Sequence, residues 1–144
     1  MRILHPTDFS SASRVALAKA LEIARSNRAQ LTIVHVRPVT VPALTDGEVS
    51  ARAYQQLDRA AEATARKQLA QLVQQAKKRG VRTNGMLVLG RPHEQIIRAA
   101  RRARADMIVI GTHGRTGLSR LFLGSVASRV VALASCPVLT VRSR

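Results

Sequence analysis

The sequence predicts an α/β fold in which a five-stranded parallel sheet is covered by helices on both faces. Three observations support this prediction. Short apolar segments alternate with longer segments rich in helix-forming residues, and this order calls for helical crossovers between parallel strands. The segment Met107–Ile110 is apolar throughout, which suits a strand buried on both faces. With 144 residues, 46% of them apolar, the chain is expected to form a single domain over residues 1–144 with a sizeable core.

The first part of the chain predicts two strands around one helix. Ile3–His5 is a short apolar strand, which Pro6 is expected to end. Ala12–Ser26 has apolar residues at helical spacing, and serines precede it that can cap its first turn. Leu31–Val36 is rich in β-branched residues and is the clearest strand in this part of the sequence. An irregular connection with two prolines and one glycine follows over residues 37–49.

A long helix is predicted over Ser50–Arg79, because this segment contains neither glycine nor proline and is rich in helix formers. At 1.5 Å per residue such a helix spans about 45 Å, so we expect part of it to project beyond the sheet. Gly80 is suited to end it. The third strand, Val81–Leu89, is expected to be irregular because Asn84 and Gly85 interrupt it.

The last part of the chain predicts two further helices on either side of the buried strand Met107–Ile110. A proline in the first turn favours a helix over Pro92–Arg104. A loop follows the buried strand, a second helix covers Ser125–Ser135, and Val138–Val141 is the fifth strand. Strands and helices therefore alternate along the whole chain.

Charge distinguishes this chain from most globular proteins. It carries 24 Lys and Arg residues, 20 of them arginine, against 8 Asp and Glu, which gives a formal net charge of +16. Such an excess favours anionic partners, among them nucleotides, nucleic acids, acidic membrane surfaces and acidic proteins. The three aromatic residues, Phe9, Tyr54 and Phe122, are too few for the stacking platforms of single-strand nucleic-acid binders.

Simple counts exclude several classes of protein. No apolar run approaches the 18 residues that indicate a membrane-spanning helix. Residues 1–6 lack the charged and apolar regions of a secretory signal and are interpreted as the start of a strand. A single cysteine, Cys136, allows no disulfide framework and no multi-cysteine metal site, and it is interpreted as a small buried apolar residue. We therefore expect a soluble cytoplasmic protein.

The most informative segment, residues 111–125, joins the buried strand to the following helix. Open α/β sheets bind ligands at the carboxyl ends of strands, and a helix N-terminus offers free N–H groups and a positive dipole to phosphates. Glycines let the backbone approach a ligand closely, although they could equally serve only to shape a long turn. Ser125 adds a hydroxyl donor, and Arg115, Arg120 and Arg129 would strengthen the positive field. The spacing matches neither the dinucleotide-binding Gly-x-Gly-x-x-Gly nor a P-loop.

The spacing Gly111-x2-Gly114-x9-Gly124-Ser125 resembles the ATP-binding signature of the universal stress protein family. Three other segments resemble the first, second and closing strands of that family, at residues 5–10, 31–36 and 136–141. By this resemblance, which covers nearly the whole chain, the sequence is identified as a single-domain member of the ATP-binding branch. It departs from common members in its charge and in the arginines of Pro92–Arg104.

The resemblance implies the adenine nucleotide alpha hydrolase-like fold, with the strands in the order 3-2-1-4-5. The first and fourth strands are then neighbours, so the loop after the first strand meets the glycine segment. The resemblance further implies that ATP, or ADP or AMP, binds there. Its expected contacts are Pro6, Thr7, Asp8 and Val36 on the adenine and ribose side, Gly111, His113 and Gly114 at ribose and phosphate, and Gly124, Ser125 and Val126 around the phosphates.

Asp8 is the candidate metal ligand, because a carboxylate can accept from ribose hydroxyls or help to hold a hydrated Mg²⁺. The alternative for this residue is a structural cap of the following helix, near Ser10. His5, His35 and His113 all lie near carboxyl ends of strands, so a metal site formed by them is a second alternative. The favoured interpretation makes His113 a neighbour of the nucleotide and the other two histidines half-buried strand residues.

These features favour an ATP-binding stress-response or regulatory protein without fast turnover, in which the nucleotide alters the binding of a protein partner. The first alternative is a slow ATPase, for which Asp8 is the one plausible carboxylate and no catalytic residue is assigned. The second is a basic protein that binds nucleic acid or another anionic surface through the arginines of Pro92–Arg104, which otherwise form a solvated helix face. The resemblance, together with the apolar edge that Val138–Val141 would expose, also predicts a homodimer.

Overall fold

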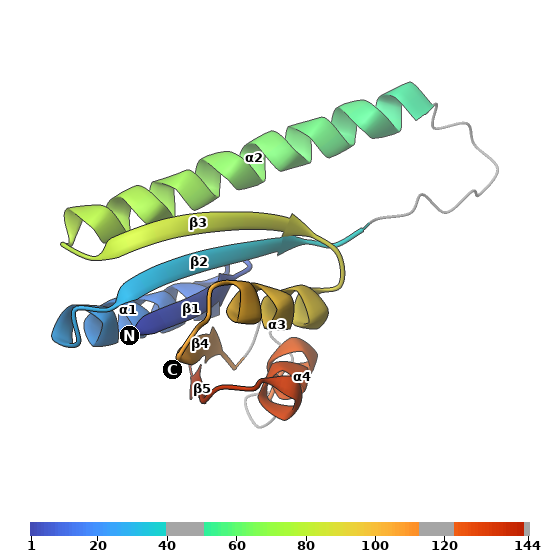
Figure 1. Cartoon of the computed structure of the whole chain (residues 1–144). Coiled ribbons are helices and arrows are strands. Elements are labelled where there is room, and N and C mark those ends of the chain that lie inside the picture. The colour runs from blue at the N-terminus through green and yellow to red at the C-terminus, as the bar shows by residue number, and fades with distance from the viewer. Residues whose placement is uncertain (40–50, 113–122, 143–144) are drawn as a thin grey trace.

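The computed structural model describes residues 1–39, 51–112 and 123–142, and it contains a five-stranded sheet with helices on both faces (Figure 1). The elements in chain order are β1 (Arg2–Thr7), α1 (Ser11–Ser26), β2 (Gln30–Arg37), α2 (Ala51–Lys78), β3 (Arg82–Leu89), α3 (Pro92–Arg102), β4 (Met107–Gly111), α4 (Ser125–Leu133) and β5 (Val138–Val141). The strand pairs of this sheet are parallel, and the strands lie in the order β3-β2-β1-β4-β5. The predicted fold class and strand order are confirmed.

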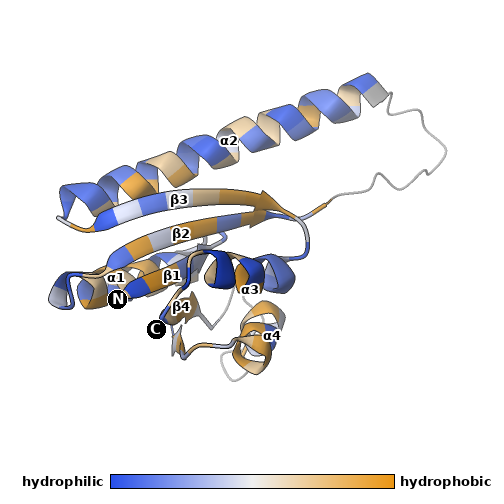
Figure 2. Cartoon of the chain, viewed as in Figure 1, coloured by the Kyte–Doolittle hydropathy of each residue, from blue (hydrophilic) through white to orange (hydrophobic). Residues whose placement is uncertain are grey.

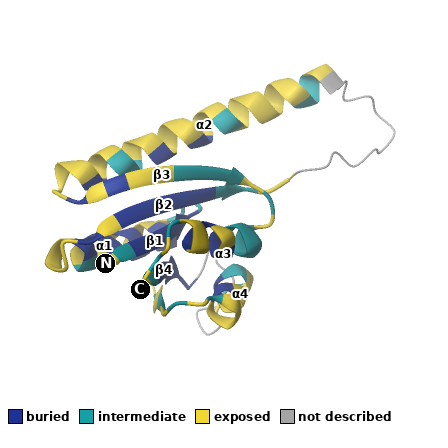
Figure 3. Ribbon diagram, viewed as in Figure 1, coloured by how far each residue is buried: buried dark blue, intermediate teal, exposed yellow. Residues whose placement is uncertain are grey.

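Two apolar layers, one on each face of the sheet, form the core. Side chains alternate along a strand, so Ile3 and Leu4 of β1 enter different layers. The layer under α1 and α2 includes Ile3, Leu17, Leu21, Leu31, Ile33 and Leu69. The layer under α3 and α4 includes Leu4, Val34, Ile96, Ile108 and Val130. Figure 3 shows that the central strands are the most deeply buried part of the molecule.

Helix α2 extends well beyond the sheet, as its length predicts (Figure 1). Its 28 residues span about 42 Å at 1.5 Å per residue. The residues that it buries, Ala65, Leu69 and Ala76, lie in its second half, whereas Leu57 near its start is 67% exposed. Most of the helix is hydrophilic (Figure 2). No helix among residues 1–39, 51–112 and 123–142 combines the length and apolar character that a membrane span needs.

The first strand is longer than predicted, because β1 continues through Pro6 to Thr7. Pro6 lies in register with Val34 of β2, whereas the ladder between β1 and β4 ends at Leu4 and Ile108. The N–H that proline lacks is therefore not needed for pairing with β4, and the strand can continue. The helices begin or end within two residues of their predicted positions: α1 starts at Ser11, α2 covers Ala51–Lys78, α3 ends at Arg102 and α4 ends at Leu133.

The third strand is regular, so the predicted interruption at Asn84 and Gly85 is wrong. The Thr32 hydroxyl donates to Oδ1 of Asn84 at 2.9 Å, which ties the asparagine to β2. A Cβ atom on Gly85 would lie 3.1 Å from both Cγ of Leu69 and Cγ2 of Val73. The glycine therefore allows α2 to approach β3 closely, because a larger residue would collide with the helix.

His5 is fully buried in β1, where half-burial was predicted. Its Nδ1 lies 2.9 Å from the Val109 carbonyl of β4 and donates its proton there, since a carbonyl only accepts. Nε2 has no hydrogen-bond partner among the described residues. Burial lowers the pKa of His5 to about 4, and the Val109 hydrogen bond and the charge of Asp8 offset this only in part. The imidazole is therefore neutral at pH 7 and ties β1 to β4.

We expect Gly85→Val to lower the free energy of unfolding by about 1–3 kcal/mol, because the new side chain would crowd Leu69 and Val73. Chemical denaturation measures this loss. Leu69→Ala makes room for the new side chain, so the double variant should lose less than the sum of the two single losses. Strictly additive losses would show that contact with α2 is not the reason for the glycine.

The buried neutral imidazole predicts that the protein loses stability as the pH falls from 6.5 to about 4. The unfolded chain takes up a proton at the ordinary histidine pKa of 6.5, whereas the folded chain does so only near 4, so acid favours unfolding across that window. The shift corresponds to about 3 kcal/mol. Denaturant titrations at a series of pH values should show that the free energy of unfolding depends less steeply on pH in His5→Leu than in the wild type. The control is His93→Gln, a change on α3; an unchanged slope in His5→Leu would contradict the assignment.

Candidate functional site

The carboxyl ends of β1 and β4 lie at the centre of the sheet, where the strand order reverses. Open α/β sheets bind ligands at such a reversal, in the crevice between the loops that follow the two strands. Ile3 pairs with Met107, and the hydrogen bond between His5 and Val109 continues the contact toward the carboxyl edge, although these two residues are 104 positions apart. The loop after β1 and the segment after β4 therefore start from adjacent points.

Two main-chain hydrogen bonds place the start of α4 at this edge. The N–H of Gly124 donates to the Thr112 carbonyl at 2.7 Å, and the N–H of Thr112 donates to the Val141 carbonyl of β5 at 2.9 Å. Gly124 is the N-cap of α4 and contributes no side-chain hydrogen bond. The N–H groups of the first turn, beginning at Ser125 and Val126, have no partner within the helix and carry the positive end of its dipole. This arrangement suits a phosphate group.

The loop after β1 is held by the predicted site residue Thr7 together with Phe9, Ser13 and His35, which were not assigned to the site. The buried Thr7 hydroxyl lies 3.0 Å from the Ser13 hydroxyl and accepts the N–H of Phe9 at 3.1 Å. Phe9 has a left-handed backbone (φ 64°), and its ring lies against that of His35, with 4.2 Å between the ring centroids. Nδ1 of His35 donates to the Thr7 carbonyl at 2.7 Å. The spacing of Ser10 and Ser13 was the signal in the sequence that could have indicated this arrangement, since the Ser10 hydroxyl caps α1 by accepting the Ser13 N–H.

Asp8 is half-buried and takes part in the turn before α1. Its Oδ1 accepts the N–H of Ser10 at 3.0 Å, while Ser10 itself is the cap of the helix. Burial alone would raise the pKa of Asp8, but hydrogen bonds from Ser10 and Ser13 outweigh it and hold the pKa below the usual value for aspartate. Asp8 is therefore an anion at neutral pH. A carboxylate of this kind suits hydroxyl groups or a cation and repels phosphate.

The other predicted site residues occupy several places at the same edge. Pro6 and Thr7 end β1, Val36 lies half-buried near the end of β2, Gly111 ends β4, and Gly124, Ser125 and Val126 start α4. His113 and Gly114 lie outside the described residues, as do Arg115 and Arg120. Arg129 of α4 lies 3.5 Å from Nε2 of His93 on α3.

Arg37, the last residue of β2, connects this edge to α2. Its side chain is 13% exposed, contacts Asp58 and lies 3.3 Å from Oε2 of Glu62. Arg66 donates to Oε1 of Glu62 at 2.6 Å. This hydrogen bond is the main reason why the pKa of Glu62 lies below the usual value for glutamate. The sequence reasoning missed this four-residue cluster, because its members lie in two elements and are ordinary surface residues by type.

The alternative metal site of His5, His35 and His113 stays a prediction, because His113 lies outside the described residues, whereas Cys136 lacks the surroundings of a nucleophile. No three His, Cys, Asp or Glu side chains among the described residues gather around one point. His5 and His35 each direct Nδ1 to a main-chain carbonyl. Cys136 is half-buried rather than buried, and burial, followed by the charge of Asp106, raises the pKa of its thiol. The thiol is therefore protonated at neutral pH, unlike a nucleophilic thiolate.

The chain matches the Universal stress protein family over residues 1–142. Universal stress protein A homolog 1 of Coxiella burnetii is 36% identical over 139 residues, which cover 96% of this chain and 94% of the relative. Universal stress protein MJ0531 of Methanocaldococcus jannaschii is 34% identical over 145 residues, 98% of this chain and 81% of the relative. The solved structure of universal stress protein UspA from Lactobacillus plantarum has a TM-score of 0.83 at 28% identity and covers 99% of this chain and 97% of its own. On these matches, the chain belongs to the universal stress protein family.

Proposed function

We propose that this chain is a cytoplasmic stress-response or regulatory protein that binds an adenine nucleotide at the carboxyl edge of its sheet, with Mg-ATP as the preferred form. The hydrogen bond from Gly124 to Thr112 carries this proposal, because it holds the phosphate-compatible start of α4 beside the ends of β1 and β4. Bound ADP or AMP would occupy the same place. The nucleotide acts by stabilising one arrangement of the edge and so changes the affinity for a protein partner.

Three solved structures of the same fold support the class of ligand. A universal stress protein was solved in complex with cAMP, the protein from Archaeoglobus fulgidus in complex with dAMP, and one from Arabidopsis thaliana with AMP bound. Their sequence identities to this chain are 23%, 24% and 23%, and their TM-scores are 0.73, 0.67 and 0.70. Because adenine is common to the three ligands, an adenine nucleotide is the ligand class that we carry over.

The charges at the edge favour one orientation of the nucleotide. The phosphates lie at Gly124, Ser125 and Val126, because main-chain N–H groups and the helix dipole stabilise negative charge there. Asp8 faces the ribose hydroxyls or a hydrated Mg²⁺, because its carboxylate would repel a phosphate.

The remaining contacts follow from that orientation and stay predictions. We assign the adenine and ribose side to Pro6, Thr7 and Val36. Ribose and phosphate contacts are assigned to Gly111, His113 and Gly114.

We expect Asp8→Asn to weaken Mg-ATP binding by roughly tenfold, since a hydrogen bond to a charged group contributes about 1.5–3 kcal/mol. The amide oxygen can still accept the Ser10 N–H, so the turn is kept. Isothermal titration of protein freed of co-purified nucleotide measures the affinity. Glu22→Gln on α1 is the control with the same change of charge. No heat with the wild-type protein at high micromolar ATP would reject the proposal.

The ionised Asp8 also favours slow ATP hydrolysis as a second candidate function, because it could help to hold the metal of bound Mg-ATP. We expect no hydrolysis that depends on Asp8, since efficient phosphoryl transfer needs several cooperating groups. Release of ADP or AMP from ATP, followed in wild type and Asp8→Asn, decides between the two functions. Faster release by the wild type would establish the enzyme.

We also propose that the protein is a homodimer joined along β5, which is an edge strand of the sheet. The carbonyl of Pro137 accepts the N–H of Ile108 in β4, and that of Val141 accepts the N–H of Thr112 just after β4. Alternation therefore directs the main-chain groups of Val138 and Thr140 to the unpaired side. These groups are suited to pair with a second β5.

Thr140→Pro should convert the dimer to a monomer, because it removes an outward N–H while leaving the ladder with β4 intact. Light scattering at micromolar concentration measures the mass of wild type, Thr140→Pro and the control Thr140→Val. A monomeric wild type, or a dimer that survives Thr140→Pro, would contradict pairing through this edge.

A further inference from the structure

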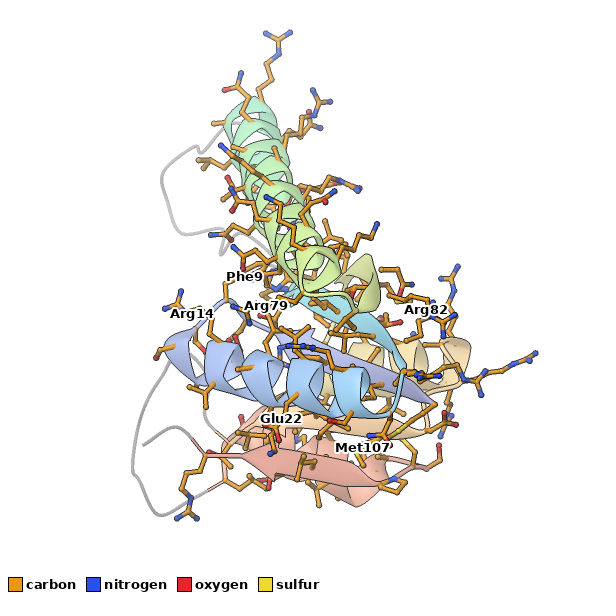
Figure 4. The ribbon with its side chains drawn as sticks, turned by 90° about the vertical axis from the view of Figure 1, so that its left-hand side faces the viewer. Phe9, Arg14, Glu22, Arg79, Arg82 and Met107 are labelled. Carbon is orange, nitrogen blue, oxygen red and sulfur yellow. The ribbon has the colours of Figure 1, made fainter. Side chains whose placement is uncertain are left out.

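Four arginines gather around one hollow at the amino edge of the sheet, opposite the proposed nucleotide site. The hollow has a volume of about 500 Å³, and Arg25, Arg28, Arg79 and Arg82 line it. Arg25 lies at the end of α1, Arg28 in the turn that follows it, Arg79 in the connection from α2 to β3, and Arg82 at the start of β3. In Figure 4, which faces this edge, Arg79 lies between α1 and α2.

The described carboxylates do not neutralise this cluster. Each of them is engaged elsewhere: Asp8 in the turn before α1, Glu22 with Lys19, Asp58 and Glu62 with Arg37 and Arg66, Glu94 with Arg91, and Asp106 with Arg2. Figure 4 shows Glu22 on the other side of α1 from Arg79. The four guanidinium groups therefore repel one another without an anionic partner in the part of the chain that the structure describes.

Helix dipoles account for only part of this charge. The C-termini of α1 and α2 lie beside the hollow, and each carries roughly half a negative charge. Together they offset about one of the four positive charges. About three positive charges remain, which is more than the capping of two helices requires.

The backbone holds the cluster in place. Arg28 and Gly80 both have left-handed backbones, with φ values of 50° and 78°, and each follows the end of a helix. Glycine is favoured at such a position, whereas an arginine there is held at a conformational cost. The small residues Ala24, Ala29 and Gly80 leave the space between the two helix ends unfilled.

We propose that this hollow binds a compact oligophosphate, either the phosphate chain of a nucleotide or a free inorganic polyphosphate. Guanidinium groups bind phosphate oxygens in pairs of parallel hydrogen bonds, and this fit distinguishes them from ammonium groups. The volume falls within the range of small-ligand sites. An adjoining hollow of about 460 Å³, lined in part by Lys77 and Arg82, offers further positive charge for a chain of phosphates.

Sodium tripolyphosphate is the probe, and isothermal titration in one fixed buffer measures its affinity. Arg28→Gly removes a charge and relieves the left-handed backbone, so this variant is expected to fold at least as well as the wild type. Combined with Arg82→Gln, it should weaken binding roughly a hundredfold, at about tenfold for each guanidinium. The control Arg98→Gln/Arg101→Gln loses the same charge from the exposed surface of α3 and should change affinity less than about threefold.

Amide signals in nuclear magnetic resonance spectra locate the ligand independently of the variants. Tripolyphosphate should shift the signals of Ala29 and Gly80, whereas a nucleotide at the carboxyl edge shifts those of Gly111 and Gly124. If ATP displaces tripolyphosphate from the amino edge, the ligand is a nucleotide phosphate chain; if it does not, the ligand is inorganic polyphosphate. Absence of tripolyphosphate binding, an equal loss in the α3 control, or binding of DNA alone would overturn the proposal.

Discussion

The hydrogen bond between the His5 imidazole and the Val109 carbonyl holds together the two strands on which the rest of the structure depends. The ladder between β1 and β4 has two residue pairs, whereas the ladder between β1 and β2 has six and that between β2 and β3 has eight. A side chain therefore continues the contact where the main chain stops. Early separation of the two strands gives the following loops room to lie around a ligand, while the buried imidazole prevents the strands from parting further.

The few carboxylates of this chain are committed to its architecture. Asp8 organises a turn, Asp106 contacts the start of β1, and Asp58 and Glu62 attach α2 to β2. The arginines that outnumber them remain on the surface, at helix ends and along α3. The two edges of the sheet differ as a result: the carboxyl edge places the Asp8 carboxylate beside main-chain donors, and the amino edge is strongly cationic. The carboxyl edge therefore suits a ligand that has hydroxyl groups or a bound cation as well as phosphates, whereas the amino edge suits phosphates alone.

Local patterns predicted most of the fold. The β-branched run of β2, the serine cap of α1 and the uninterrupted length of α2 each depend on neighbouring residues, and each was predicted correctly. The errors arose where distant residues decide the outcome. From the sequence alone, Gly85 was interpreted as a break in a strand. In the structure it is needed because α2 packs closely against β3 at this position. Burial of His5 depends on β4, which follows about a hundred residues later in the chain.

The candidate site was predicted in the same uneven way. Glycine spacing and family resemblance pointed to the ends of β1 and β4 and the start of α4, because these features lie in contiguous segments, and the nucleotide contacts assigned there stay predictions. The contact of Phe9 with His35 and the cluster around Arg37 could not be predicted, since both require the register of elements that meet only in the folded chain. The cationic hollow at the amino edge was not predicted for the same reason, because its arginines lie in separate segments of the sequence.

The attachment of α2 through Arg37 makes the protein respond to electrolyte in two opposite ways. Mobile ions screen the repulsion among the surface arginines, which favours the compact state. The same ions weaken the attraction between Arg37 and the half-exposed carboxylates of Asp58 and Glu62, which secure the overhanging part of the helix. Rising electrolyte thus favours the compact body of the molecule and weakens the attachment of its longest helix.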